Sequence, residues 1–134
     1  MIGIDTNILV YAFDDSDPKK RSVCKRILEG ILDGREKGAV TMQILAEFAR
    51  AITQKVPHPL SRKEAADIVG GILYDANWQV FSYEGDHIVK ALASAQPFWY
   101  ALIAQTLLAN HVTTIITENV KDFSGSGLKA KCPF

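Results

Sequence analysis

Hydrophobic and polar positions along the chain fall into two kinds of stretch, short apolar runs and longer segments with helical spacing. The short runs predict strands at residues 1–4, 39–41, 78–81 and 113–117. The helically spaced segments predict helices at residues 7–13, 18–32, 43–54, 62–74, 85–95 and 98–110. The tail, residues 124–134, can add an edge strand. Strands that alternate with helices predict an α/β protein, a three-layer α/β/α fold with a central, mainly parallel sheet.

Residues at the expected helix boundaries agree with this pattern. We expect Thr6 or Asn7 to cap the first helix, because short polar side chains accept hydrogen bonds from free backbone N–H groups there. Asp17 followed by proline fits the start of the second helix. Ser61 with Glu64 three residues later fits a capping box. These local signals predict where the helices begin.

Length and composition predict one globular domain spanning residues 1–134. The chain has 134 residues, of which 48% are hydrophobic, and this favours a packed core over disorder. The formal net charge is zero, which neither favours nor excludes a nucleic-acid partner, since a local basic face is enough to bind one. Cys24 and Cys132 are far apart and no C-x-x-C motif occurs, so zinc and redox sites are not expected.

The N-terminal residues bear on localisation. The chain reaches Asp5 without a preceding basic segment, so we expect no signal peptide. No apolar run approaches the length that spans a membrane. Two unpaired thiols are typical of a reducing compartment. We therefore expect a cytoplasmic protein with no membrane partner.

Four oxygen-bearing residues follow strands or lie just beyond them. Asp5 ends the first expected strand, Glu47 lies about one turn into the helix after the second, and Asn119 and Asp122 follow the last. The carboxyl ends of parallel strands meet at one edge of a sheet, so these side chains are expected to converge. Carboxylate and amide oxygens suit Mg²⁺ or Mn²⁺. Such an ion lowers the pKa of bound water and neutralises charge on a phosphoryl group.

Each of these residues also has an ordinary structural interpretation. Asp5 can cap the following helix, and Glu47 can be a solvated residue on a helix surface. Asn119 can be a turn residue and Asp122 a cap. Spacing alone leaves both interpretations open.

Four segments of the chain together resemble the PIN-domain family, and in particular the VapC-type toxins of bacterial and archaeal toxin–antitoxin pairs. They are IDTNIL at residues 4–9, QILAEF at 43–48, FWYALIA at 98–104 and TENVKDF at 117–123, in the family's order and across nearly the whole chain. The resemblance implies an endoribonuclease that uses Mg²⁺ or Mn²⁺. It also implies an RNA substrate, inhibition by a small antitoxin protein and a homodimer.

The resemblance also implies roles for particular residues. It makes Asp5 and Glu47 the first two acids of a catalytic metal site and gives Asn119 and Asp122 to the fourth motif. Asp5, Glu47 and Asn119 would hold the metal. The supporting residues would be Thr6, Asn7 and Thr117.

Tyr100 departs from the family pattern. The family has an aspartate at this position, where it helps to hold the metal. A phenol is neutral at pH 7, is a poor ligand for a hard cation and is far bulkier than aspartate. We therefore predict weak metal binding and impaired hydrolysis. The tyrosine has two explanations: a natural binding-only homologue, or a change acquired in a cloned toxin gene, since Asp and Tyr codons differ by one base.

Other interpretations of the chain compete with a toxin ribonuclease. One is a catalytically silent PIN-like module that binds RNA or a protein. An unrelated phosphotransfer domain is disfavoured, because the chain has neither a P-loop nor a G-x-G-x-x-G motif. The basic residues within 19–26 can attract phosphate, although a solvated helix surface is the preferred interpretation. Trp99 can stack on bases, but a core or dimer-interface position is more usual.

Overall fold

The computed structural model describes residues 1–134 and contains five strands and six α-helices. The strands are β1 (Ile2–Ile4), β2 (Gly38–Thr41), β3 (Trp78–Phe81), β4 (Thr114–Ile116) and β5 (Lys129–Lys131). The helices are α1 (Thr6–Phe13), α2 (Pro18–Leu32), α3 (Met42–Gln54), α4 (Arg62–Tyr74), α5 (Gly85–Ala93) and α6 (Phe98–Ala109). A 3₁₀ helix, η1, spans Val120–Phe123.

The strands form one parallel sheet in the order β3-β2-β1-β4-β5. Central β1 pairs on both sides, so that Gly3 lies opposite Ala39 of β2 and Ile115 of β4. The expected edge strand in the tail is confirmed as β5, which pairs with β4. The sheet is thus parallel throughout, as the alternation of strands and helices predicted.

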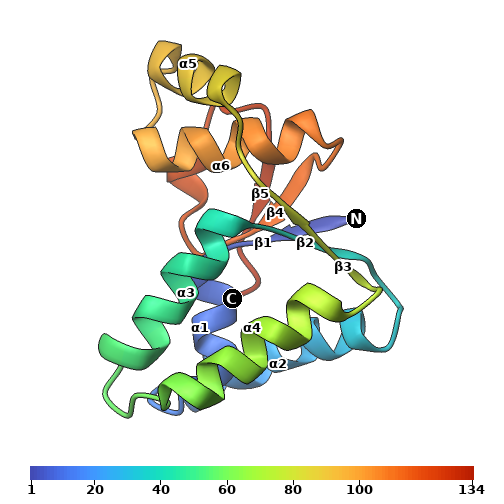
Figure 1. The fold of residues 1–134 in the computed structure, drawn as a ribbon, viewed down its shortest axis with the longest axis vertical. Coiled ribbons are helices and arrows are strands. Elements are labelled where there is room, and N and C mark those ends of the chain that lie inside the picture. The colour runs from blue at the N-terminus through green and yellow to red at the C-terminus, as the bar shows by residue number, and fades with distance from the viewer.

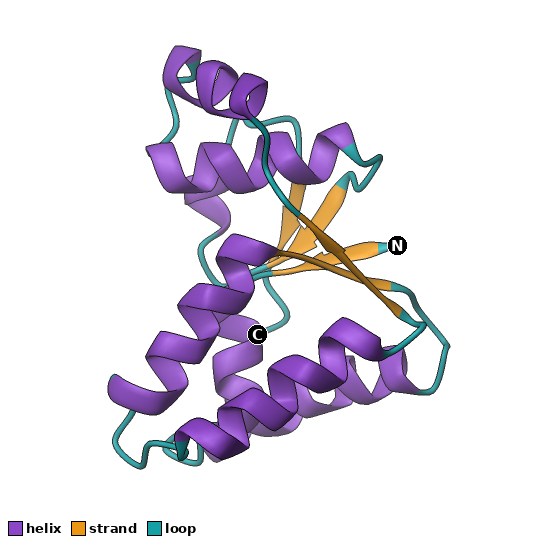
Figure 2. Ribbon diagram, viewed as in Figure 1, coloured by secondary structure: helices purple, strands orange, loops and turns teal.

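Helices cover both faces of the sheet. Helices α5 and α6 lie on one side and α1 to α4 on the other, as Figures 1 and 2 show. The main core joins the sheet to both helical layers, and its fully buried side chains include Ile4, Ile44, Phe48, Leu107 and Ile115. The three-layer α/β/α prediction is therefore confirmed. None of the helices combines the length and apolar character needed to cross a membrane.

Two predicted helix boundaries are wrong. Asp5, rather than Thr6 or Asn7, caps α1, because its extended backbone lets its side chain accept a hydrogen bond from the Thr6 amide. Helix α5 ends at Ala93 instead of residue 95, because Ser94 has an extended backbone with φ −80° and ψ 153°. The capping box opened by Ser61 and the Asp17 cap are confirmed.

The strand order places a crevice at the carboxyl end of β1. The chain passes from β1 to its neighbour β2 through α1 and α2, and it reaches the opposite neighbour, β4, only after β3, α5 and α6. Such a reversal of strand order leaves open space beyond the carboxyl ends of the central strands, where α/β proteins bind ligands. The residues after β1, β2 and β4 meet at this edge.

Candidate active site

Asp5 is the most buried acid at this edge. It follows β1 directly and its side chain is only 3% exposed. One carboxylate oxygen accepts from the Thr6 amide at 2.8 Å, and the other accepts from the Thr117 hydroxyl at 2.6 Å and the Asn7 amide group at 3.2 Å. These three donors come from α1 and from the residue after β4, so they hold the carboxylate at the junction of two strands.

Burial dominates the electrostatics of Asp5. Desolvation raises the pKa of this carboxyl above its usual value, and the nearby negative charge of Glu47 raises it further. The hydrogen bonds from Thr117, Thr6 and Asn7 lower the pKa but do not offset the effect of burial. Asp5 is therefore an acid held where the charged form is disfavoured, which is a common property of functional sites.

Glu47 reaches the same edge from α3. The Thr6 hydroxyl donates to one of its carboxylate oxygens at 3.0 Å, and the Gln43 side-chain amide donates to the other at 2.9 Å. Thr6 therefore bonds to both acids, through its amide to Asp5 and through its hydroxyl to Glu47. Glu47 itself is exposed, so this acid faces solvent while Asp5 does not.

Tyr100 and Asn119 line the same cavity as the two acids. The Tyr100 hydroxyl accepts a hydrogen bond from the Asn119 side-chain amide at 3.1 Å. The Tyr100 ring packs edge-on against Phe123, with 5.2 Å between ring centroids. Burial raises the pKa of the Tyr100 phenol, and the negative charge of Asp5 adds to this effect. The hydroxyl therefore stays protonated and neutral at physiological pH.

A cavity of about 360 Å³ connects these groups. Its lining consists of Asp5, Thr6, Asn7, Val10, Tyr11, Glu47, Ala51, Tyr100 and Asn119. The structure thus brings together Asp5, Glu47 and Asn119, which the sequence predicted to converge. Asp122 lies in η1 and outside this lining, although its charge contributes to the raised pKa of Tyr100.

Comparisons with known proteins find similarity at the level of structure. No model of a protein family matches the sequence, and no curated protein matches it either. VapC20 of Mycobacterium tuberculosis, described as a sarcin–ricin loop cleaving toxin, superposes with a TM-score of 0.68 and 14% identity, covering 96% of each chain. The chain has the VapC-type fold.

Two further structures share this fold. FitAB bound to an IR36 DNA fragment matches with a TM-score of 0.65 and 15% identity, over 99% of this chain and 95% of that one. VapBC2 from Rickettsia felis, bound to a DNA fragment from its promoter, matches with a TM-score of 0.66 and 16% identity over 98% of each chain. At these identities the similarity describes the fold alone.

The residues of this cavity do not form a complete metal site. No group of three or more His, Cys, Asp or Glu side chains is arranged to hold a metal ion. All four carboxylate oxygens of Asp5 and Glu47 already accept hydrogen bonds within the protein. Tyr100 contributes a neutral phenol, and the Asn119 amide nitrogen is directed at that phenol. Two carboxylates with neutral neighbours fit poorly to a hard divalent cation, which needs anionic oxygens to replace its water.

The sequence did not predict a second polar network beside the cavity. Glu118 accepts from the Tyr11 hydroxyl at 2.6 Å and forms an ion pair with Lys20 of α2, and its backbone amide donates to the Asn7 side chain at 3.1 Å. The Lys20 ammonium lies over the Tyr11 ring. This network fixes the loop after β4, which carries Asn119. In the sequence, the one indication of this network is that Glu118 directly precedes Asn119.

Proposed function

We propose that this chain is a metal-dependent endoribonuclease of the VapC toxin type whose active site is impaired by Tyr100. The observation that carries the proposal is the shared hydrogen bonding of Thr6 to Asp5 and Glu47 at one cavity of a VapC-type fold. These two acids are far apart in the sequence and on different elements. Their convergence on one edge is what a nuclease needs to orient a phosphodiester and water.

The proposed impairment is a matter of charge and volume. We infer that a form with a third carboxylate beside Asp5 and Glu47 would use Mg²⁺ or Mn²⁺, because anionic oxygens are the ligands that these hard cations prefer. Asp5 and Glu47 supply two negative charges, whereas Tyr100 and Asn119 supply none. An aspartate at position 100 would add a third carboxylate. It would also remove an aromatic ring from the space beside Asn119.

A second candidate function has support from the packing of Tyr100. Its hydroxyl bonds to Asn119 and its ring packs on Phe123, so the tyrosine is an integrated part of the cavity wall. Such a wall is compatible with a catalytically silent PIN-like module that binds RNA or a protein. An aspartate at position 100 should restore RNA cleavage if the chain is an impaired nuclease, and it should not do so if the chain is a silent binding module.

Cleavage of a labelled RNA distinguishes the two candidates. We would compare the Tyr100 protein, Tyr100→Asp and Tyr100→Phe, each with Mn²⁺ and with EDTA. The proposal predicts at least ~100-fold faster cleavage by Tyr100→Asp, equivalent to about 2.7 kcal/mol of barrier, and loss of that gain in EDTA. Tyr100→Phe keeps the ring without its hydroxyl and should stay inactive.

Two results would count against this proposal. Brisk metal-dependent cleavage by the Tyr100 protein would contradict the account of the cavity. If Tyr100→Asp is folded and binds metal but shows no gain, the silent module becomes the better description.

We also infer a protein partner. FitAB and VapBC2, which share the fold, are complexes bound to DNA fragments. By analogy, we propose that this chain pairs with a small antitoxin protein and that RNA is its substrate. Exposed apolar side chains on α5 and α6 support a homodimer.

A further inference from the structure

Three adjoining cavities follow the outer surface of α3. The candidate active-site cavity shares Thr6, Glu47 and Ala51 with a second cavity of about 330 Å³, which is also lined by Arg50 and Lys55. Arg50 in turn lines a third cavity, of about 390 Å³, together with Arg62 at the start of α4. These shared lining residues place Arg50, Lys55 and Arg62 along α3 and the start of α4, beside the cavity of the two acids.

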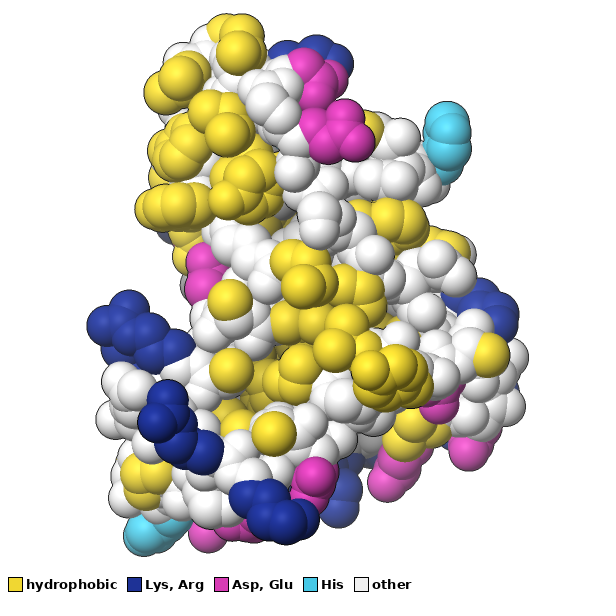
Figure 3. Space-filling view, viewed as in Figure 1, with side chains coloured by type: hydrophobic (Ala, Val, Ile, Leu, Met, Phe, Trp, Pro, Cys, Tyr) yellow, Lys and Arg dark blue, Asp and Glu magenta, His cyan; other side chains and the backbone are white.

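These cations have no partners within the protein. Arg50, Lys55 and Arg62 are exposed, and none of them belongs to an ion pair. Glu47 precedes Arg50 by almost one turn, but its two oxygens are bonded to Thr6 and Gln43 instead. Lys and Arg side chains project over α3 and the start of α4 in Figure 3. Their charge is available to an external anion.

Helix geometry places these cations in line with the cavity. Glu47, Ala51 and Lys55 recur at the four-residue spacing of one helix surface, and Arg50 follows Glu47 by three residues beside it, so that all four line the second cavity. At 1.5 Å per residue, Lys55 lies about 12 Å along the axis from Glu47. The helix therefore presents positive charge beside the acids, at increasing distance from them.

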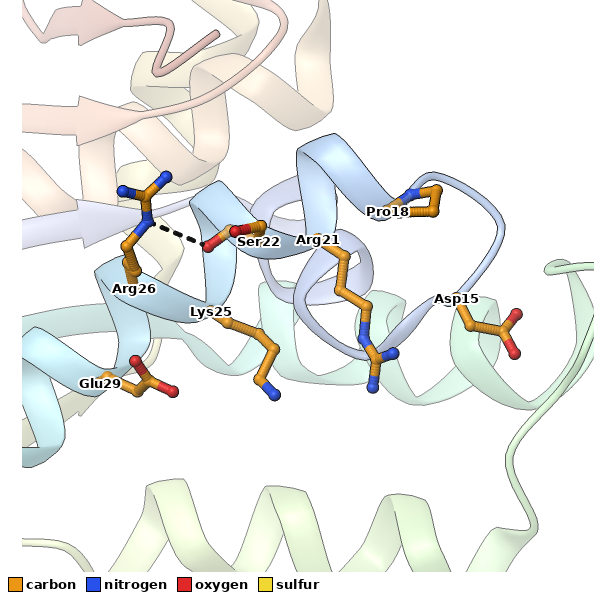
Figure 4. Close-up of a pocket in the computed structure, with 7 residues that line it drawn as sticks. All are labelled: Asp15, Pro18, Arg21, Ser22, Lys25, Arg26 and Glu29. Carbon is orange, nitrogen blue, oxygen red and sulfur yellow. Dashed lines mark hydrogen bonds between the residues drawn. The ribbon is translucent and has the colours of Figure 1, made fainter.

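The basic residues of α2 are a less suitable place for the same ligand. A cavity of about 360 Å³ there is lined by Arg21, Lys25 and Arg26, but also by Asp15 and Glu29, which oppose their charge (Figure 4). In Figure 4, Arg26 points away from Arg21 and Lys25, and its guanidinium donates to the Ser22 carbonyl at 3.5 Å. This cavity shares no lining residue with the active-site cavity.

We propose that Arg50 and Lys55, with Arg62 beyond them, bind consecutive phosphates of the RNA strand on the α3 side of the Asp5–Glu47 cavity. This inference rests on the proposed nuclease function and adds where the backbone of the RNA substrate lies on the protein surface. Phosphate contacts of this kind orient a strand and carry no sequence information. The strand would enter the cavity past Glu47, with its backbone held by the guanidinium and ammonium groups of α3.

RNA binding by the Tyr100 protein tests this path without requiring catalysis. Fluorescence anisotropy of a labelled single-stranded RNA of roughly ten nucleotides would be measured in EDTA at several salt concentrations. We expect Arg50→Gln/Lys55→Gln to weaken binding at least ~10-fold and to reduce the salt slope by about 1.4, which is about 0.7 for each lost phosphate contact. The matched control, Lys25→Gln/Arg26→Gln, removes the same charge from α2 and should bind within ~2-fold of the parent.

Three outcomes would overturn the path. They are an unchanged affinity in Arg50→Gln/Lys55→Gln, an equal loss in the α2 control, and no RNA binding by the parent protein. This test is separate from the cleavage test. If the α3 variant loses RNA but Tyr100→Asp never cleaves it, the path stands and the nuclease proposal fails. If Tyr100→Asp cleaves RNA and the α3 variant binds normally, the nuclease proposal stands and the path fails.

Discussion

Asp5 has two roles at the level of single residues. It caps α1 through the Thr6 amide, which is its ordinary structural interpretation, and it also lines the cavity beside Glu47. The two interpretations that the sequence left open are therefore compatible. Burial of its carboxylate next to a second acid costs stability, and sites that bind charged ligands commonly carry this kind of cost.

The first prediction concerns Asp5→Asn and its dependence on pH. The folded-state pKa of Asp5 is raised above 3.8, so the folded protein binds this proton more tightly than the unfolded chain does. The stability that Asp5 contributes is fully present at pH values below its pKa in the unfolded chain. That stability is lost as the pH rises through its pKa in the folded protein. A neutral asparagine avoids that loss. We expect Tm at pH 7 to rise by roughly 3–5 °C, or about 1 kcal/mol, and the gain to shrink below pH ~4.

Thermal unfolding between pH 3 and 8 measures this effect. Asp33→Asn, at the exposed C-cap of α2, serves as the control and should change stability by less than about 0.5 kcal/mol. A lower Tm for Asp5→Asn at every pH would mean that the hydrogen bonds to the carboxylate outweigh its burial.

Gly38 shows how closely two elements pack against β2. A Cβ atom at this position would lie 2.8 Å from Ile31 of α2 and 2.8 Å from the Trp78 ring of β3. Gly70 in α4 has nothing within 4 Å of the same hypothetical atom. Alanine at Gly38 therefore tests a steric clash in a strand. Alanine at Gly70 tests only the general preference of helices for alanine over glycine.

We predict opposite effects for alanine at these two glycines. Gly38→Ala should destabilise the protein by about 1–3 kcal/mol, because the added Cβ would meet the buried Ile31 side chain and the buried Trp78 indole, and a packed indole cannot move away cheaply. Gly70→Ala, the matched control, should stabilise it by about 0.5–1 kcal/mol. Chemical denaturation gives both values. Equal stabilisation by the two substitutions would show that the packing around β2 is looser than described.

The sequence predicted the elements better than it predicted contacts between them. Apolar runs and helical spacing located β1 to β4 and the six α-helices within a few residues, whereas β5 was expected only as a possible edge strand in the tail and η1 was not predicted. The end of α5 was missed, and Asp5 was one of several caps that the sequence allowed for α1, since backbone conformation at a boundary depends on neighbours in space.

The candidate site was likewise predictable only in part. Asp5, Glu47 and Asn119 follow strands, and the parallel topology brings such positions to one edge. The ion pair of Lys20 with Glu118 was not predictable, because it requires α2 to pack beside the loop after β4. No local pattern encodes that arrangement.

The surface of the whole molecule carries an apolar patch over α5 and α6. Its main exposed side chains are Val89 and Leu92 of α5 and Trp99 of α6, which are 66%, 72% and 57% exposed. Hydrophobic side chains gather over these two helices in Figure 3. Trp99 is therefore not a core residue, and a contiguous exposed patch is typical of an interaction surface.

The patch leads to a prediction about oligomeric state. We expect a homodimer that buries this surface, since symmetric pairs are the commonest assemblies. Val89→Glu/Leu92→Glu should give a monomer by light scattering, because two buried charges would face their copies. Tyr74→Glu changes an aromatic residue on α4 that is more exposed still, at 90%, and that variant should remain dimeric. A monomeric parent protein at working concentration would contradict the prediction.

In the function proposed for this chain, Tyr100 stands where a third carboxylate beside Asp5 and Glu47 would complete a metal site. Calorimetric titration with Mn²⁺ tests it directly and needs no knowledge of the RNA target. We predict that Tyr100→Asp binds one Mn²⁺ per chain at least ~10-fold more tightly than the Tyr100 protein, a difference of about 1.4 kcal/mol. Adding Asp5→Asn to Tyr100→Asp should abolish the gain. Equally tight binding by the Tyr100 protein, or a gain that survives loss of Asp5, would contradict the account.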